Sequence, residues 1–482
     1  MKLFPALACV FLIAAFESGC GGVGTTAGGP TGPSSPPTNL TILSQTAGDS
    51  STAYRDHPDP SICVGPGYVM EFNGLDVILR TKSAMGAIVS TSTQVNFWAN
   101  VVSRTGGGGF TVGDVIGDPS CYYDPLSQRW FLVENDGGTN NAGTGLWIAV
   151  SASSDPTGVW RGFLDIPPQI NDLEPFVGAD KNGFYVCGID STGSIPTASQ
   201  FCDAFPIADM EWSGAAYPAT THRNRLRGFQ QASRPVIDTN PNKSASDPFV
   251  IAARSGPAQN CASASCTWGW LVSLGQWSGA TASIVGAHNQ ALNSSMTWYT
   301  PPAAGVLEPG GNYVKVRESH TCGSAYASAA SSSFYIACGE GVSPTHMGIF
   351  WAQINPSTLS VMQGGMISPV DSSGNAIDAI FPSLAIDGND NVVITYTGVS
   401  STVYPSTYTT AQYPGDGLGT FRTPAQIYAG ATSYTADNPA GWGVYGSTAV
   451  DPSDGTVWGY NQVGLSSSEW ATGIVHFSMP AP

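Results

Sequence analysis

DPSCYYD, residues 118–124, contains the pattern that decides the fold: a residue X, a proline, a short apolar run and an aspartate six residues after X. The pattern recurs along the chain, usually with Asp or Asn in the last position. The other copies are DPSICVG from Asp59, EPFVGAD from Glu174, RPVIDTN from Arg234, FPSLAID from Phe381 and a proline-less YGSTAVD from Tyr445. Copies at intervals of about 55–65 residues indicate repeated blades that bury their sheet faces against one another.

A second strand follows each pattern across a turn rich in Asp, Asn and Gly. Such turns join the strands of a hairpin, because these side chains bond their own backbone and tolerate positive φ. We therefore read the aspartates of these turns as turn residues: Asp124, Asp180, Asp387 and Asp451. Runs beginning at Gly145, Trp268 and Met347 are expected to be outer strands.

The predicted fold is an all-β propeller of seven four-stranded blades. Six copies of the pattern are clear, and a seventh start is expected near Glu318–Thr321, where the hairpin is present without the X-Pro step. Six or eight blades, or a pair of β-sandwiches, stay open as alternatives. The tryptophans Trp130, Trp160 and Trp458 fall where blades pack together and are expected in the core.

Composition narrows the classes of partner. The 482 residues include 11% charged residues and carry a formal charge of -17 with only 17 Lys and Arg. A nucleic-acid partner is excluded, since binding phosphates requires a basic surface. The acidity suits a protein outside the cytoplasm and leaves room for a cation site. No cofactor is required, and calcium is the candidate cation.

The amino-terminal residues predict export. Residues 1–20 combine Lys2, an apolar stretch and small residues before Cys20, and a Gly/Pro/Ser/Thr-rich run follows. This arrangement resembles a bacterial lipoprotein, in which the lipidated cysteine would be Cys20, residues 21–53 a tether and residues 54–482 one propeller domain. Ordinary secretion is the alternative. The expected product is a monomer in the cell envelope or outside the cell, touching a membrane only through its lipid.

Eight further cysteines suit an exported chain, because disulfides form outside the reducing cytoplasm. Sequence proximity favours three pairs: Cys187 with Cys202, Cys261 with Cys266 and Cys322 with Cys338. Cys63 and Cys121 remain, and they lie in equivalent strands of consecutive repeats, which a propeller places side by side. A zinc site is disfavoured, since no Cys-x2-Cys pair is present.

Longer segments resemble a family of secreted bacterial β-propellers of the sialidase-like type. The segments are GDPSCYYDPLSQRWFLVEN, LWIAVSASSDPTGVWRGF and DLEPFVGADKNGFYV, together with the carboxyl-terminal run from GDGLGT to ATGIVHF. The resemblance implies an exported propeller and little about activity. Sialidase chemistry itself is disfavoured, because arginines are scarce and the Asp-box turn survives only as SDGTVW at Ser453–Trp458.

The first three X residues are similar in type and order to the carboxylates of arabinanase-, xylosidase- and invertase-type glycosidases. That resemblance implies Asp59 as base or nucleophile, Glu174 as general acid and Asp118 as the orienting carboxylate, since two carboxyl groups can flank a glycosidic bond. Arg234 and His320 would then bind substrate.

Two other interpretations of the X residues stay open. The polar side chains can simply begin strands and face solvent, or their oxygens can bind a cation. The functional alternatives are accordingly a surface module that binds glycan or protein and a glycoside hydrolase. Because the carboxylates and the arginine belong to the first four copies, while Phe381 and Tyr445 are aromatic, a site would lie on the side of those four blades.

Overall fold

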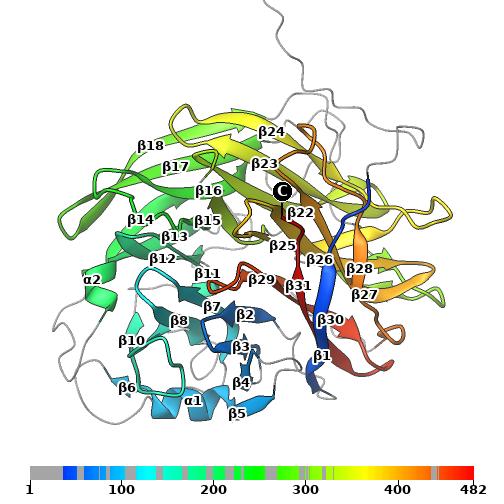
Figure 1. Cartoon of the computed structure of the whole chain (residues 1–482), viewed down its shortest axis with the longest axis horizontal. Coiled ribbons are helices and arrows are strands. Elements are labelled where there is room, and N and C mark those ends of the chain that lie inside the picture. The colour runs from blue at the N-terminus through cyan, green and yellow to red at the C-terminus, as the bar shows by residue number, and fades with distance from the viewer. Residues whose placement is uncertain are drawn as a thin grey trace, which may run out of the picture.

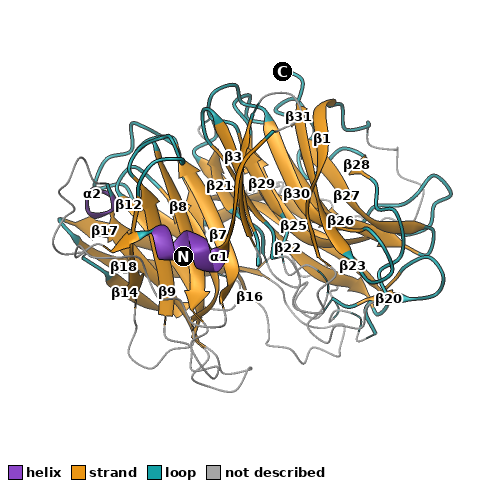
Figure 2. Ribbon diagram, turned by 90° about the horizontal axis from the view of Figure 1, so that it is seen from below, coloured by secondary structure: helices purple, strands orange, loops and turns teal. Residues whose placement is uncertain are grey.

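The computed structural model describes residues 36–51, 59–74, 76–82, 87–103, 116–136, 145–165, 172–190, 199–211, 222–229, 233–255, 269–291, 299, 302, 304–316, 322–328, 330–435, 442 and 445–481. Within them nearly every element is a strand, and the short helices α1 (Gln94–Asn100) and α2 (Ile207–Met210) lie at the outside of the molecule (Figures 1 and 2). In this described part, no helix has the length and hydropathy needed to cross a membrane.

Apart from one two-stranded hairpin, the described strands can be grouped into seven antiparallel sets, two of which share an eight-stranded sheet through a parallel pair. We call these sets blades and name them by their innermost strands. The first blade, from the inside outwards, contains β2 (Ser61–Val64), β3 (Tyr68–Phe72), β4 (Asp76–Thr81) and β5 (Ile88–Thr93). The second contains β7 (Ile116–Asp124), β8 (Arg129–Asp136), β9 (Gly145–Ser151) and β10 (Trp160–Asp165), with β6 (Val102–Ser103) parallel to β10. The third contains β11 (Asp172–Ala179), β12 (Gly183–Asp190), β13 (Ser199–Pro206) and β14 (Asn224–Phe229).

The next blades follow the same order. They are β15 (Arg234–Ile237), β16 (Phe249–Ser255), β17 (Gly269–Ser278), β18 (Thr281–Ala291); β21 (Ala325–Ser328), β22 (Ser333–Ser343), β23 (His346–Asn355), β24 (Ser360–Ile367); and β25 (Asp378–Ile386), β26 (Val392–Ser400), β27 (Val403–Gln412), β28 (Ala425–Tyr428). Strands β15 and β21 pair in parallel, and a separate hairpin, β19 (Val306–Leu307) and β20 (Tyr313–Val314), precedes β21. The predicted all-β propeller is thus confirmed as the fold.

The last blade joins the two ends of the chain. It contains β29 (Ser447–Val450), β30 (Val457–Gly464), β31 (Trp470–Ser478) and, outermost, β1 (Thr41–Ser51). Figure 1 shows the blue β1 beside the dark red β31, and the pairing runs from Thr41 opposite Ser478 to Ser51 opposite Trp470. The predicted boundary between tether and domain, after residue 53, is therefore too late. The Ser/Thr-rich β1 lacks a buried face of its own and becomes a strand by pairing with β31.

Three of the X-Pro steps form bulges at the start of an innermost strand. The register shifts between Gly117 and Ser120 in β7, and the corresponding positions of β11 and β25 shift in the same way. The X residues Asp59, Asp118 and Phe381 have positive φ values of 42°, 52° and 52°. A bulge bends the strand and turns a side chain away from the regular alternation. In β7, β11 and β25 the X-Pro step and the bulge therefore coincide.

The serine two residues after X joins neighbouring blades. The hydroxyl of Ser61 accepts a hydrogen bond from the Cys121 amide at 2.9 Å, and that of Ser447 accepts one from the Ile62 amide at 3.0 Å. In the β21 blade the matching sequence is CGSAYAS, so the seventh X position is Cys322. The predicted start at Glu318–Thr321 is just short of it.

Aromatic side chains fill the spaces between blades. Phe131 of β8 stacks on Phe184 of β12 with ring centroids 4.4 Å apart, and both rings are buried. The tryptophans expected in the core, Trp130, Trp160 and Trp458, are also buried. The hydrophobic stabilisation is thus spread around the ring, in the faces that adjacent blades bury against each other.

The structure contains three of the four predicted disulfides, and all three are buried. Cys63–Cys121 joins the innermost strands of two blades with Cα atoms 5.7 Å apart. Cys187–Cys202 and Cys322–Cys338 each join two strands within one blade. Cys261 and Cys266 lie outside the described residues, as does Cys20.

Candidate functional site

A cavity of about 610 Å³ lies on the axis of the ring. Its walls come from the innermost strands of all seven blades, and every proline of the X-Pro steps lines it: Pro60, Pro119, Pro175, Pro235 and Pro382. Proline suits this position because it needs no backbone donor and stiffens the strand start. The volume falls in the range of about 300–1,000 Å³ that is usual for small-molecule sites. We call this cavity the axial channel.

At the X-Pro end of the channel, an aromatic and cationic cluster brings three blades together. The Arg234 guanidinium carbon lies 3.0 Å from the centroid of the Phe176 ring. The rings of Tyr445 and Phe176 pack edge to face, with their centroids 4.8 Å apart. All three residues line the channel. Tyr445, placed by the sequence on the far side from the first four blades, therefore reaches across to the β11 blade.

Arg234 is fixed by its neighbours. It is 2% exposed, its Nε donates to the Cys322 carbonyl oxygen at 2.6 Å, and its Nη1 donates to the Ser233 carbonyl oxygen at 3.0 Å. Its strand therefore connects to the β21 blade through the side chain as well as through the parallel backbone pairing. A guanidinium held in this way presents a preorganised, permanently charged group to the channel.

The predicted catalytic carboxylates do not belong to the described lining of the axial channel. Asp59 is 4% exposed and Asp118 is half-buried, and neither belongs to the described channel lining, although the prolines that follow them do. Glu174 lies in β11, but its side chain falls outside the described part of the structure, and His320 lies outside it entirely. The grouping of Asp59, Asp118 and Glu174 as a catalytic set stays a prediction.

The positive φ of the two aspartates has an architectural origin. Strained backbone often marks a functional site. Phe381, however, has the same φ as Asp118 at the equivalent bulge and carries no group for acid-base chemistry. The conformation therefore belongs to the repeated bulge, where Asp is one of the residue types that tolerate it best.

At its other end the channel is lined by the Asx turns. The Asp451 carboxylate accepts the Ser453 amide at 2.9 Å, and the Asp387 carboxylate accepts the amides of Asn389 and Asn391, each at 2.9 Å. Burial raises the pKa of Asp387, and the bonds from Asn391 counter part of that increase. The predicted role of these aspartates as turn residues is confirmed.

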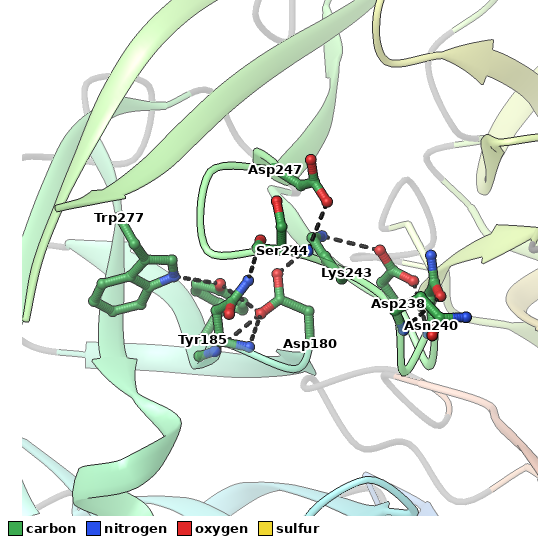
Figure 3. Close-up of polar contacts among 11 residues, drawn as sticks. Asp180, Tyr185, Asp238, Asn240, Lys243, Ser244, Asp247 and Trp277 are labelled. Carbon is green, nitrogen blue, oxygen red and sulfur yellow. Dashed lines mark hydrogen bonds and ion pairs between the residues drawn. The ribbon is translucent and has the colours of Figure 1, made fainter. Parts of the chain in front are cut away.

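Two lysines join these turns between blades. Lys243 binds Asp180 of the β11 blade and Asp238 of the β15 blade, with both Nζ to oxygen distances at 2.9 Å (Figure 3). Lys82 of the β2 blade contacts Asp451 of the β29 blade and donates to the Ser453 hydroxyl at 2.7 Å. The acidic turns are thus partly neutralised. Among the described residues no group of three or more His, Cys, Asp and Glu is placed to hold a metal ion.

The sequence offered one unused signal for the site. Five of the seven copies, including the one in the β21 blade with Ser324, carry Ser two residues after X. The β11 copy carries Phe176 there. Phe176 is the one aromatic ring at this position among the copies, and it lines the channel. The contact of Phe176 with Tyr445 had no sequence signal, because the two residues are far apart in the chain.

Comparisons with known proteins show similarity to solved structures only. No protein-family model matches the chain, and no curated protein sequence matches it. The structure is similar to a protein of unknown function from Dyadobacter fermentans, with a TM-score of 0.39 and 8% identity over 76% of this chain and 95% of that one. At this level of similarity the fold assignment rests on the strand pairing described above.

Two enzymes are also similar at the same low level. The catalytic domain of a GH62 alpha-L-arabinofuranosidase from Coprinopsis cinerea gives a TM-score of 0.33 at 12% identity, covering 92% of this chain and 98% of that one. A mutant Trypanosoma rangeli sialidase with trans-sialidase activity gives 0.39 at 8% identity, covering 78% of this chain and 57% of that one. Neither value supports an argument about activity.

Proposed function

We propose that this chain is an exported β-propeller that binds a small glycan in its axial channel. The observation that carries the proposal is the cluster of Phe176, Arg234 and Tyr445 at one end of a cavity of about 610 Å³. Aromatic faces stack on the apolar faces of sugar rings, and a guanidinium donates hydrogen bonds to hydroxyl or carboxylate oxygens. The three buried disulfides support export, and attachment to the envelope through Cys20 is part of the proposal.

Replacing Tyr445 with alanine is expected to weaken glycan binding at least tenfold. The substitution removes the aromatic wall opposite Phe176, and stacking of one aromatic ring is worth about 0.5–1.5 kcal/mol beyond the area that it buries. A glycan array with neutral and acidic sugars would identify a ligand, and calorimetry with that sugar would measure the change. Tyr445→Phe is expected to retain most of the affinity, because the ring remains.

The matched control is Tyr404→Ala. Tyr404 is a 39% exposed tyrosine on β27 and does not line the channel. If Tyr445→Ala bound the sugar as tightly as Tyr404→Ala does, the channel would not be the binding site. An array without any ligand would contradict glycan binding itself.

A glycoside hydrolase is the second candidate, and the strand arrangement favours it in one respect. The disulfide Cys63–Cys121 and the bond from the Cys121 amide to Ser61 set the starts of β2 and β7 side by side. Asp59 and Asp118 stand at those two starts. Neighbouring carboxyl groups are what glycoside hydrolysis requires.

Loss of hydrolysis in Asp59→Asn would support this candidate. If the wild-type protein cleaves a glycoside in a screen of nitrophenyl and oligosaccharide substrates, removal of an acid-base group is expected to lower kcat by about 10²–10⁴. The amide is isosteric, so a fall in kcat with the thermal stability unchanged identifies a chemical role. Equal activity in both proteins would remove Asp59 from the mechanism.

A further inference from the structure

One side of the β19–β20 hairpin is apolar and packs against the β21 and β25 blades. Val306 and Val314 belong to one buried cluster with Phe381, Val399 and Trp442. Phe381 also lines the axial channel. The hairpin therefore supports the outer side of a residue whose ring forms part of the channel wall.

Glu308, at the turn of this hairpin, has no exposed surface. Its Oε2 accepts the Tyr434 amide at 3.1 Å, and the Ser433 hydroxyl donates to the neighbouring Pro309 carbonyl at 2.6 Å. The Trp442 amide donates to the Lys315 carbonyl at 3.0 Å. Three hydrogen bonds thus join the hairpin and the residue after it to Ser433, Tyr434 and Trp442.

The second carboxyl oxygen of Glu308, Oε1, has no hydrogen-bond partner within the described ranges, and neither does the Trp442 indole nitrogen. An ionised carboxylate in such a place is disfavoured, because it loses water and gains no cation from the described residues. Burial raises the pKa of Glu308 from its ordinary value of 4.5 to about 7, and the Tyr434 amide offsets only part of the increase.

Among the titratable groups of this region that the structure describes, none shifts the pKa of Glu308 by its charge. The described ones on the elements that pack here are Tyr313, Lys315, Tyr434, His346, Asp378 and Tyr396. His346 Nδ1 lies 3.2 Å from Asp378 Oδ1, so these two groups interact with each other. Lys315 is exposed. Burial also raises the pKa of Asp378, with the Met347 amide and His346 opposing it.

We propose that Glu308 is a proton-operated latch, which holds the β19–β20 hairpin against Ser433, Tyr434 and Trp442 when protonated and loosens it when ionised. The folded-state pKa lies above that of the free side chain. Closure is therefore fully favoured below pH 4.5 and weakens as the pH rises to about 7. Loosening withdraws support from Phe381, at the X-Pro end of the channel, and from Trp442. The latch makes the channel wall firmest in acidic surroundings.

Hydrogen exchange measured between pH 5 and pH 8 tests the latch without a ligand. In the wild-type full chain, the protection of the Tyr434 amide and of residues 306–314, normalised to the intrinsic rate at each pH, is expected to fall roughly tenfold per pH unit between pH 5 and 7 and then to level off. In Glu308→Gln the side-chain amide oxygen still accepts the Tyr434 N–H, and position 308 no longer titrates. Its protection is expected to stay flat across this range.

The matched control is Glu469→Gln. Glu469 is a half-buried carboxylate in the turn between β30 and β31, near Thr435 and outside the hairpin cluster, and its variant is expected to keep the wild-type profile. A flat wild-type profile would overturn the latch, whether or not Glu308→Gln folds. A profile in Glu308→Gln that falls as steeply as in the wild type would also overturn it, because another group would then be titrating.

Discussion

Replacing Cys63 and Cys121 together with serine is expected to lower the free energy of unfolding by about 4 kcal/mol. The bridge closes a loop with a sequence separation of 58 residues, and in the chain-entropy model a longer loop constrains the unfolded chain more. It also joins the first two innermost strands beside the channel. Denaturant unfolding of the purified variant, compared with the oxidised wild type, measures the loss.

The matched control is the double variant Cys187→Ser and Cys202→Ser. That bridge is also buried, joins neighbouring strands of one blade and has a sequence separation of only 15 residues. The expected loss is about 3 kcal/mol. A smaller loss for the Cys63–Cys121 pair than for this control would contradict the role of that bridge as a link between blades.

Replacing Lys243 with methionine is expected to cost about 3–5 kcal/mol of stability. The ammonium group is 7% exposed and holds Asp180, which is 1% exposed, and Asp238. Asp180 also accepts a hydrogen bond from Tyr185, whose hydroxyl accepts one from Trp277, as Figure 3 shows. Removal of the cation would leave a buried carboxylate without its partner at the junction of two blades. Thermal and urea unfolding at pH 7 measure the effect.

Lys181→Met is the control for Lys243→Met, because Lys181 is the exposed neighbour of Asp180. It is expected to change stability by less than about 0.5 kcal/mol. A partner variant, Asp180→Asn combined with Lys243→Met, is expected to recover part of the loss, since no buried charge is left unpaired. Equal stabilities of Lys243→Met and Lys181→Met would show that the ion pair contributes nothing.

The stabilisation by Lys243 is expected to be lost only at alkaline pH. Burial by itself lowers the pKa of Lys243, but the carboxylates of Asp180 and Asp238 outweigh it and raise the pKa above its ordinary 10.5. The contribution is therefore complete below pH 10.5 and is lost as the pH rises through the folded-state pKa. The destabilisation in Lys243→Met is accordingly expected to persist through neutral and mildly alkaline pH.

Local chemistry explains why so much of the fold could be predicted. The X-Pro step, the apolar run and the Asx turn each act within a few residues, so the innermost strands and their hairpins can be read directly. Equivalent positions in consecutive repeats even predicted the bridge between Cys63 and Cys121. The turn aspartates, Asp387 among them, were predicted correctly for the same reason.

Less of the site could be predicted from the sequence, because a site depends on where side chains point, and the catalytic grouping of Asp59, Asp118 and Glu174 stays a prediction. Asp59 and Asp118 were expected at the axis, but both have positive φ, and the prolines that follow them line the channel instead. Arg234, the first residue of the fourth pattern, does line the channel. Phe176 and Tyr445, which do line it, belong to blades far apart in sequence. Glu308 carries no sequence signal at all, since its raised pKa arises from burial under residues of several blades.

By itself, the sequence determined the repeating strand and turn unit, the all-β class and the disulfide partners within and between neighbouring repeats. The tertiary structure alone decided that β1 completes the last blade, that Tyr445 crosses the axis to Phe176 and that Lys243 joins two blades. The physical reason is the distance along the chain over which each interaction acts. Backbone preferences and turn hydrogen bonds act between residues close in the chain, whereas ring closure, burial and ion pairing depend on segments that meet only when the chain has folded.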